Sequence, residues 1–579
     1  MSDAPARPCD PIELALLLTR SSSLFLAIGA TLYLAALLGL VLNASLALCA
    51  ALAAAILTAL SCGGLREAKL RPSDLLTVVV GCVLVAWIRP RVMDAVAWDV
   101  AAYGLMKYPE MKAGIIGPYF SYGNVYEFLV SYVDHFLTPV GGVAVLHSLS
   151  LVFLAVFSCN YARATRSRMA LGACLLLLFY DPTDTVRPAL SYLLAGKNDV
   201  LVAALVLQVW AVVLVRRDSR ARAIRVFDFV VTNAVAACAV GIKASALIAI
   251  GPPLVLYWSE FLVRAARSVS RLRLASVLSA VALAWLFFCW QYVLNVFVLG
   301  SIVDKTGATV GMWFSVVGLV GFSPIALARS SPPVFALALA LTVLIVIGLI
   351  QNAGREVLVL RVSALLLVLL CPWVFNGTPQ SPQFRLVLSA VFLAGIDAAA
   401  VGGGLFQRLV RPFSQWATPV PGFLARPVLP AMVWAVPTAL AVLALAPRTL
   451  NDYTAYFHRE YREAYMYFAD MPGQRIYSYG LAPYFLAGRG KQHHLTYDLS
   501  RTKTLLDDPG GLVRSLVDCV SPSYLVFSDR VVGNAYFPKL LVPGIERVYE
   551  DEHLIILRNP AGGSGRRGAA CPPRYVMAG

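Results

Sequence analysis

Residues 228–262, DFVVTNAVAACAVGIKASALIAIGPPLVLYWSEFL, decide how this chain is threaded. The run is too long for one perpendicular crossing of a bilayer, which takes about 20 apolar residues. Gly241 and the charged Lys243 interrupt it, and the pair Pro252 and Pro253 follows; glycine weakens helices and proline breaks or kinks them. We therefore predict two short helices that meet near Lys243, so that the chain crosses the membrane twice here.

The apolar character of this run extends over most of the chain. Of 579 residues, 59% are hydrophobic and only 14% are charged, whereas a soluble domain carries about 25% charged residues. We predict a polytopic α-helical membrane protein with about thirteen transmembrane helices. The expected spans are 24–43, 45–62, 74–89, 141–160, 169–180, 199–215, 228–242, 245–262, 274–298, 333–351, 362–375, 384–401 and 430–447.

Basic residues indicate the orientation of these spans. Arginines and lysines cluster in the loops near 66–71, 163–168, 216–225 and 264–273, and such loops face the cytoplasm. With two crossings over 228–262, the N-terminus is expected inside and the C-terminus outside. The polar segments 90–140, 181–199, 299–332 and 376–385, the corner at Lys243 and all residues after 448 then share the extracytoplasmic side.

The net charge of +16 is explained by these loops and by anionic lipid headgroups. No basic stripe with stacking aromatic residues indicates a nucleic-acid partner. Most of the 11 cysteines lie in apolar runs, and no CxxC motif is present. Cys519 and Cys571 lie in the polar C-terminal part and would be able to pair if that part is extracytoplasmic.

Composition divides the chain into three parts. Residues 1–447 form the expected transmembrane catalytic domain, whose first large extracytoplasmic loop is 90–140. Residues 448–560 are mixed polar, with a tyrosine-rich amphipathic helix, strands at 475–479, 524–527 and 554–557, and a helix near 512–519, which predict a small extracytoplasmic α/β domain. In it, His493 and His494 are expected to be solvated. Residues 561–579 are rich in Gly, Arg and Pro and are expected to be a disordered tail.

The first large loop contains the stretch Trp98-Asp-Val-Ala-Ala-Tyr103. If Asp99 caps the helix that follows, Tyr103 and Lys107 lie on one face of it, one and two turns later. A carboxylate beside a membrane can be a plain helix cap, and spacing alone does not separate this interpretation from a functional one.

Further charged residues gather on the same predicted side. The loop adds Asp94, Glu127 and Asp134. The next polar tract adds Asp181, Asp184, Arg187, Lys197 and Asp199, and later segments add Lys243 and Arg385. Ionisable residues at membrane depth are costly, so they are usually paired or functional. The alternative for Lys243 and Arg385 is a snorkelling or topology-setting cation, and for Arg187 and Lys197 a solvated loop charge.

One carboxylate that faces several cations suits the transfer of a sugar from a polyprenyl phosphate. The acceptor hydroxyl needs a base, and the departing phosphate needs positive charge. No general acid is required, because phosphate is a good leaving group, unlike the leaving group in glycosidases. Arg and Lys both bind phosphate.

This arrangement resembles the GT-C superfamily of polyprenyl-phosphate-sugar-dependent glycosyltransferases, in the bacterial branch related to protein mannosyltransferases and lipid A aminoarabinose transferase. The motifs are the 98–103 stretch, Gly196-Lys-Asn-Asp-Val200, Gly241-Ile-Lys243, Ser381-Pro-Gln-Phe-Arg385 and a small C-terminal α/β domain. The resemblance implies a multi-pass protein of the bacterial inner membrane and an inverting transfer on the extracytoplasmic side, with Asp99 as the base.

The resemblance also implies the other participants. Lys243, Arg385, Lys197 and Arg187 would bind the donor phosphate. Several branches carry Asp-Glu where this chain has Asp99-Val100, so Glu127 or Asp184 would supply a second acid or, with Tyr103, bind the acceptor. The partners are a polyprenyl-phosphate-linked sugar, a glycan, lipid or protein acceptor, and membrane lipids. A divalent cation stays open as a cofactor, because some relatives bind one near the acid, although Asp94, Asp99 and Asp184 do not form a spacing that demands one.

Three other functions stay open. A lipid or polysaccharide transporter or flippase would distribute its charges along a path through the membrane, whereas here they gather on one side. A polysaccharide polymerase or ligase of another membrane fold would usually place its large loop late in the chain. A non-catalytic scaffold would use the C-terminal domain to bind a partner.

Overall fold

The computed structural model describes residues 11–61, 104–112, 125–137, 140–150, 198–217, 226–244, 246–268 and 270–299, then 459–479, 493–498, 508–528, 534–562 and 575–577, together with positions 82, 83, 85–87, 100, 152, 153, 339, 342, 343, 346, 362, 481 and 486. The predicted spans at 74–89, 169–180, 333–351, 362–375, 384–401 and 430–447 lie wholly or largely outside the described residues.

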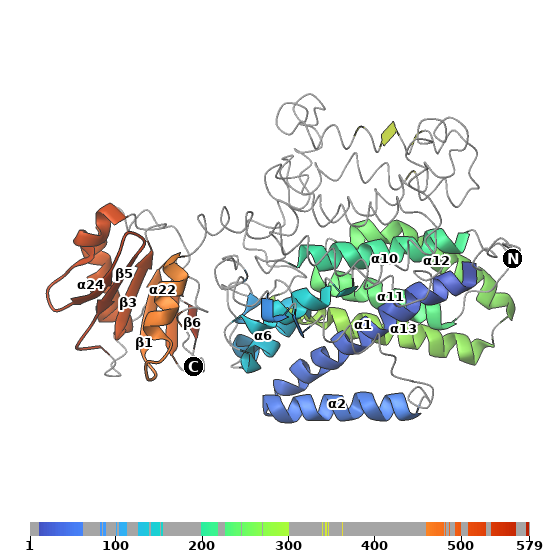
Figure 1. Ribbon diagram of the computed structural model, residues 1–579, viewed down its shortest axis with the longest axis horizontal. Coiled ribbons are helices and arrows are strands. Elements are labelled where there is room, and N and C mark those ends of the chain that lie inside the picture. Colours follow the sequence, from blue (N-terminus) through green and yellow to red (C-terminus); the bar gives the residue numbers. More distant parts are fainter. Residues whose placement is uncertain are drawn as a thin grey trace, which may run out of the picture.

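Helices make up the described part of the chain before residue 300 (Figure 1). Their bounds confirm that six predicted apolar segments, 24–43, 45–62, 199–215, 228–242, 245–262 and 274–298, are helical. The long helices are α1 (Pro11–Gly39), α2 (Ala44–Ser61), α10 (Asp199–Arg217), α11 (Val226–Ile242), α12 (Ala246–Ser268) and α13 (Arg271–Leu299), and the short ones are α5 (Lys107–Lys112) and α6 (Val125–Phe136). A further apolar helix covers Gly141–Ser150.

The apolar segment 228–262 is divided into two helices, as predicted. α11 ends at Ile242 and α12 begins at Ala246, and Lys243 lies between them. Pro252 and Pro253 lie inside α12. The break therefore occurs at the lysine corner, and the two prolines do not end the second helix.

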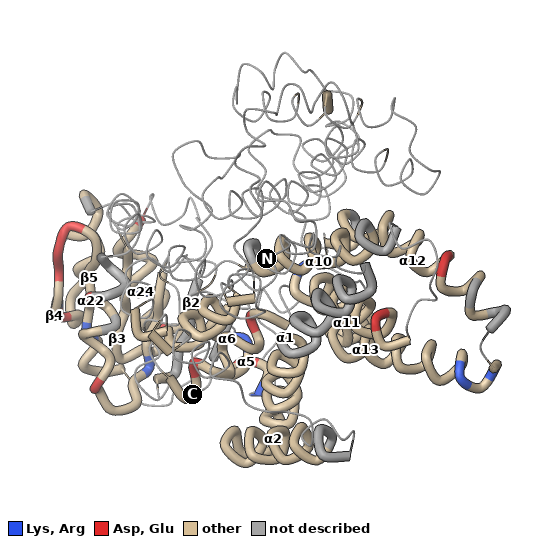
Figure 2. Tube along the Cα trace, turned by 45° about the vertical axis from the view of Figure 1, so that its right-hand side comes forward, with Lys and Arg blue, Asp and Glu red and all other residues tan. Residues whose placement is uncertain are grey.

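α13 carries the clearest signature of a membrane span. Among the described residues, Arg271–Val298 is the one helix long and apolar enough to cross a bilayer, while the other apolar helices there are shorter. Figure 2 shows two basic positions where α13 begins and few charges along the helices; Arg271 and Arg273 are that pair. Leu283 and Phe297 of α13 are exposed, which is the arrangement expected of a helix that faces lipid.

Small residues let α11 approach α13 closely. Ala236, Ala237 and Ala239 of α11 are fully buried. A side chain at Gly241 would collide with the backbone carbonyl of Phe288 on α13 and would lie 2.9 Å from Cγ2 of Val125 on α6. Small residues at helix contacts allow such backbone proximity in membranes. Gly241 thus sets the distance between three helices.

The first large loop is attached to the turn between α1 and α2. The Tyr108 hydroxyl of α5 donates a hydrogen bond to the Gly39 carbonyl at 2.9 Å, and the Tyr132 hydroxyl of α6 donates one to the Ala44 carbonyl at 2.8 Å. Lys112 Nζ donates to the Leu42 carbonyl at 3.3 Å. These bonds satisfy one carbonyl at the end of α1, one in the turn and one at the start of α2, and two segments predicted on one side of the membrane are in contact.

The C-terminal part is a six-stranded sheet of order β4-β5-β3-β1-β2-β6. The strands are β1 (Arg475–Tyr479), β2 (His494–Asp498), β3 (Tyr524–Ser528), β4 (Glu546–Glu550), β5 (Leu554–Arg558) and β6 (Tyr575–Met577). β1 pairs in parallel with β2 and β3, whereas β5 lies antiparallel to β3 and β4, and β6 lies antiparallel to β2. A short 3-10 helix, η4, covers Asn534–Leu540.

Helices cover both faces of this sheet (Figure 1). Val513 and Leu516 of α24 (Pro509–Val520) pack with Leu525 on one face. Phe468 of α22 (Arg459–Phe468) belongs to the cluster that contains Val526, from the opposite face. Alternate strand residues point to opposite faces, so both faces need an apolar cover. The predicted strands at 475–479, 524–527 and 554–557 and the helix near 512–519 are confirmed.

Two sequence expectations in this part are wrong. Tyr575–Met577, inside the predicted disordered tail 561–579, forms β6 and pairs with Leu495–Tyr497, because an apolar three-residue segment can occupy an open sheet edge. His493, expected to be solvated, is buried: its Nδ1 accepts from the Gln474 amide at 2.9 Å, and its Nε2 lies 2.9 Å from the Phe468 carbonyl, to which it donates.

Cys519, in the last turn of α24, is disulfide-bonded. Its partner lies outside the described residues, as does Cys571, the partner suggested by the sequence. Disulfides persist in oxidising compartments; the extracytoplasmic position of the sheet stays a prediction.

Gly241→Val should destabilise the helical bundle, because the added side chain must displace the Phe288 backbone and the Val125 side chain. We expect a loss of about 1–3 kcal/mol in the free energy of unfolding, seen as a lower melting temperature of the full chain in detergent. Gly29→Ala in α1 is the matched control, because nothing lies within 4 Å of the added atom. Equal melting of both variants would contradict this account of the α11–α13 contact.

Cys519→Ser should cost about 2–4 kcal/mol of unfolding free energy, the usual contribution of a disulfide. The melting temperature of the full chain should fall in the variant and, for the wild type, on addition of a reductant. Cys49→Ser is the control, because Cys49 is a free exposed thiol on α2. Alkylation of Cys519 in the native, unreduced protein would show that the bond does not form.

Candidate functional site

A buried carboxylate lies where α6 begins. Glu127 is in the first turn of α6, and only 7% of its surface is exposed. Its Oε1 accepts a hydrogen bond from Asn198 Nδ2 at 2.8 Å. Its Oε2 is buried and accepts no hydrogen bond from any residue that the structure describes. Burial of a carboxylate is costly unless charge or hydrogen bonds compensate it, so the surroundings of Glu127 need an explanation.

Asn198 holds this carboxylate from the start of α10. The Val202 amide donates to the Asn198 carbonyl at 3.0 Å, which makes Asn198 the residue that precedes the helix. An asparagine at this position usually caps the helix by accepting a hydrogen bond from its first turn. Here the side-chain amide nitrogen donates to Glu127. The bond therefore ties the beginning of α10 to the beginning of α6.

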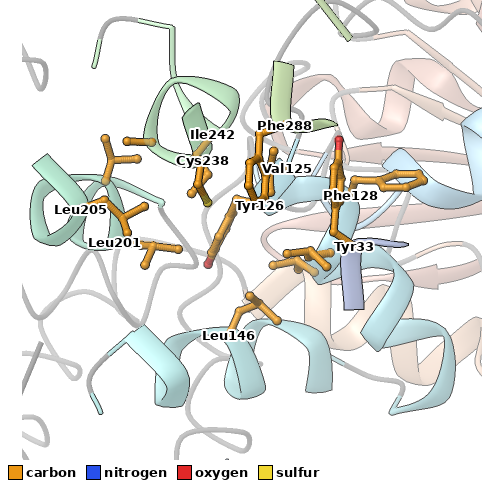
Figure 3. Close-up of a cluster of buried hydrophobic side chains, with 14 of the residues drawn as sticks. Tyr33, Val125, Tyr126, Phe128, Leu146, Leu201, Leu205, Cys238, Ile242 and Phe288 are labelled. Atoms are coloured by element: carbon orange, nitrogen blue, oxygen red, sulfur yellow. The ribbon is translucent and has the colours of Figure 1, made fainter. Parts of the chain in front are cut away.

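Lys243 brings positive charge from the corner between α11 and α12. Its amide donates to the Ala239 carbonyl at 3.0 Å, and its carbonyl accepts from the Ala246 amide at 2.9 Å, which positions the lysine between the helices. Gly241, two residues earlier, contacts Val125, two residues before Glu127. Figure 3 shows Val125 beside Phe288 and near Ile242 in the apolar layer next to these ends.

Lys107 is the second cation, at the start of α5, and is 1% exposed. Burial lowers the pKa of this lysine to about 8, and the charges of Glu110 and Glu127 oppose that shift. Gly104, three residues earlier, packs next to the Glu127 side chain: an added Cβ would lie 3.6 Å from Glu127 Cγ. The segment that follows Asp99 in the chain thus reaches Glu127.

Asp99 lies outside the described residues, so the helix cap suggested for it stays a prediction, but the described residues after it do not form one regular α-helix through Lys107. The Leu105 amide donates to the Val100 carbonyl at 2.8 Å, five residues back, and α5 begins only at Lys107. A wide turn of this kind is common at functional sites. After this turn the Lys107 side chain is buried inside the protein and not exposed to solvent.

Burial raises the pKa of Glu127 to about 7. Its own backbone hydrogen bond, the charge of Lys107, the amide of Asn198 and the charge of Lys243 each oppose this shift, in that order. Glu127 lies in the predicted extracytoplasmic loop and not in a span. Near neutral pH this carboxyl group is therefore able to hold or release a proton.

We call Lys107, Glu127, Asn198 and Lys243 the helix-end cluster. It joins the starts of α5, α6 and α10 to the corner between α11 and α12. Buried Lys107 with Glu110 beside it, half-buried Lys243 and the titratable Glu127 carboxyl group are able to bind an anionic group and exchange a proton. The site prediction contained two residues of the cluster, Glu127 and Lys243. The role of Asn198 could have been inferred only if all residues of the polar tract 196–199 had been considered as site residues.

The other predicted site residues lie outside the described residues. They are Asp99, Tyr103, Asp184, Arg187, Lys197 and Arg385. Two of them are adjacent in sequence to described positions: Val100 follows Asp99, and Asn198 follows Lys197. Within the described ranges, no group of three or more His, Cys, Asp or Glu side chains is arranged to hold a metal ion, and Asp94, Asp99 and Asp184 are not among these residues.

Comparisons with known proteins find one similarity. ArnT from Cupriavidus metallidurans, solved bound to undecaprenyl phosphate, shares 18% sequence identity over 84% of this chain and 98% of the ArnT chain, with a TM-score of 0.47. No protein-family model and no curated protein matches the sequence.

The raised pKa of Glu127 predicts how stability depends on pH. Between its ordinary value of 4.5 and about 7, the folded state holds a proton that the unfolded state has lost, so the free energy of unfolding falls as pH rises through this window. The Glu127→Gln variant has no titratable group at this position, so it should lack this fall in the free energy of unfolding. The fall amounts to about 3 kcal/mol or less in the wild type. Melting of the full chain in detergent from pH 4.5 to 8 measures it.

Asp518→Asn is the control for this experiment, because Asp518 is an exposed carboxylate on α24. The Glu127→Gln curve should rise relative to the wild type as pH increases from 4.5 to 7, whereas the Asp518→Asn curve should stay parallel to it. Parallel curves for all three proteins would mean that Glu127 titrates like a solvated carboxyl group.

Proposed function

We propose that the chain is an integral membrane glycosyltransferase. It moves a sugar from a polyprenyl-phosphate donor to an acceptor hydroxyl on the extracytoplasmic side of the bacterial inner membrane, with inversion at the anomeric carbon. Its partners are the lipid-linked sugar and a glycan, lipid or protein acceptor.

The helix-end cluster is the observation that supports this proposal most directly. Lys107 is buried, and Lys243 is half-buried at a helix corner. The carboxylates of Glu110 and Glu127 act on Lys107, and Glu127 also interacts with Lys243. Lysines held among apolar helices by neighbouring carboxylates suit a ligand that combines a phosphate with a hydrocarbon chain.

The proposed reaction needs a base and a phosphate clamp. Asp99 takes the proton of the acceptor hydroxyl, whose oxygen attacks the anomeric carbon from the face opposite the phosphate. The bond between that carbon and the phosphate oxygen breaks, and its electron pair leaves with the polyprenyl phosphate. Positive side chains stabilise the charge that develops on the leaving group.

In this proposal the clamp consists of Lys243, Arg385, Lys197 and Arg187. Glu127 keeps the clamp in place in two ways. It binds Asn198, the residue between Lys197 and the start of α10, and its charge attracts Lys243. Asp184 and Tyr103 contact the acceptor. When a divalent cation is bound near Asp99, it would add charge stabilisation at the same phosphate.

Asp99→Asn and Lys243→Ala test the two roles. Asp99→Asn should reduce transfer by about a hundredfold or more, because a general base contributes 10²–10⁴-fold, without loss of donor binding. Lys243→Ala should weaken donor binding and reduce transfer by at least tenfold. Membranes that contain each variant are assayed with radiolabelled undecaprenyl-phosphate sugars, at equal protein level.

Asp228→Asn and Lys539→Ala are matched controls. Asp228 is a buried acid in the first turn of α11, and Lys539 stacks on Tyr536 in the C-terminal sheet part; both variants should keep full transfer. Full activity of Asp99→Asn would overturn the base assignment and direct attention to Glu127 and Asp184. Lack of transfer by the wild type from every donor, with lipid movement across vesicles instead, would favour a transporter.

A further inference from the structure

A tyrosine and two carboxyl groups meet where α22 packs on the hairpin of β4 and β5. The Tyr549 hydroxyl of β4 lies 3.0 Å from Glu463 Oε2 on α22 and 3.0 Å from Asp551 Oδ2 in the hairpin turn. The two carboxyl groups also hydrogen-bond to each other. All three side chains are half-buried. Two acidic groups in direct contact repel when both are ionised, so this contact needs an explanation.

The contact requires a proton that separated carboxyl groups would not carry at neutral pH. A hydroxyl has a single proton to donate, and an ionised carboxyl group only accepts hydrogen bonds. The Tyr549 proton therefore serves one of its two neighbours at a time. Burial and the bonds to Glu463 and Asp551 raise the pKa of Tyr549, so this hydroxyl keeps its own proton. The bond between the two carboxyl groups needs a second proton, which one of them must hold.

Glu463 holds this second proton, because the surroundings of Asp551 favour the ionised form. Asp551 Oδ1 accepts hydrogen bonds from the His553 amide at 2.8 Å and the Leu554 amide at 2.7 Å. Bonds donated to a carboxylate stabilise its charge. Burial raises the pKa of Asp551, but its bonds with Glu463, these two amides and Tyr549 outweigh that effect and hold the pKa below its ordinary value. Glu463 is therefore neutral while Asp551 is charged.

The proton acts on one part of α22 only. At the end of the helix, the rings of Tyr467 and Phe468 pack edge-on against the ring of Tyr524, with centroids 6.4 and 5.4 Å apart. These apolar contacts do not depend on pH. Glu463 lies one turn before Tyr467 and contacts the hairpin through polar atoms. Loss of the shared proton would place two negative charges in contact there, while the aromatic contacts stay in place.

We propose that the proton shared by Glu463 and Asp551 holds α22 on the hairpin of β4 and β5, and that its loss at higher pH loosens the first part of the helix. A proton that is bound only when the contact is formed makes the contact stronger at acid pH and weaker as pH rises. α22 is the described element through which the chain enters the sheet. The proton thus sets how firmly that entry is held, whatever reaction takes place at the helix-end cluster.

Other titratable and charged groups lie around this contact. They are Tyr467 on α22, Tyr524 on β3, Arg558 on β5, which acts on Tyr467, and the pair of His553 and Glu552 in the hairpin turn. Tyrosine and arginine side chains keep their protons below pH 8. Histidine titrates near pH 6.5, and His553 Nε2 lies 3.3 Å from Glu552 Oε1. His553 is therefore the group that the controls must separate from Glu463.

Hydrogen exchange of the full chain in detergent tests this proposal between pH 4.5 and 8. Mass spectrometry of peptides from α22 gives the protection of its amides, after correction for the intrinsic exchange rate at each pH. α24, on the other face of the sheet, is the internal reference. In the wild type, protection of α22 relative to α24 should fall roughly three- to tenfold as pH rises, because a single hydrogen bond at a partly exposed place contributes modestly to stability.

Glu463→Gln should remove this fall. The amide of the variant still donates a hydrogen bond to Asp551 but has no proton to lose in this range, so α22 should stay protected up to pH 8. Should Glu463→Gln fail to fold, Asp551→Asn removes the other charge and should likewise keep α22 protected at high pH. Glu552→Gln and His553→Gln are the matched controls in the same hairpin turn, and both should retain the wild-type fall.

Three results would overturn the proposal. The first is wild-type protection of α22 that does not change between pH 4.5 and 8. The second is a fall that persists unchanged in Glu463→Gln and Asp551→Asn, which would place the titrating group elsewhere. The third is loss of the fall in His553→Gln, which would assign the pH dependence to the histidine. None of these results bears on the proposed transfer reaction.

Discussion

Burial of the Glu127 carboxylate is the constraint on which the helix ends depend. A carboxyl group away from water is tolerated only with hydrogen bonds or opposite charge nearby. The chain supplies these from three places that are distant in sequence: Lys107 before α6, Asn198 before α10 and Lys243 after α11. Each lies at a helix terminus, where the backbone changes direction and a side chain can turn inward. Compensation of one charge thus holds several termini together.

Close packing between helices keeps these termini at the right distance. Gly241 allows α11 to touch the backbone of α13 and the side chain of Val125. The hydroxyls of Tyr108 and Tyr132 attach α5 and α6 to carbonyls at the turn between α1 and α2. In a membrane, apolar contact gains little over contact with lipid, so small residues and hydrogen bonds specify which helices meet. The polar cluster therefore depends on apolar positions several residues away from it.

The C-terminal sheet follows the rules of a protein in water. Its core strands are apolar on both faces because α22 and α24 cover them, and those strands were recognised from their apolar runs. β2, β4 and β6 escaped sequence prediction because they lie toward or at the edges, where polar residues such as His494 and Glu546 are tolerated. His493 shows the same limit, because two backbone groups, of Gln474 and Phe468, make its burial acceptable, and neither is visible in the sequence.

The sequence by itself determined the helices, the break at Lys243 and the strands of the sheet core. The spacing of hydrophobic residues and the presence of helix-breaking residues control the conformation of the backbone close to them, so both can be recognised without the tertiary structure. It also drew attention to Glu127 and Lys243, since charges beside apolar runs are costly wherever the chain goes. The tertiary structure decided which charges meet. That Asn198, just before α10, binds Glu127 and that Lys107 is buried after a wide turn depend on contacts between residues far apart in the chain. No local pattern encodes such contacts, because they arise only when the helices pack.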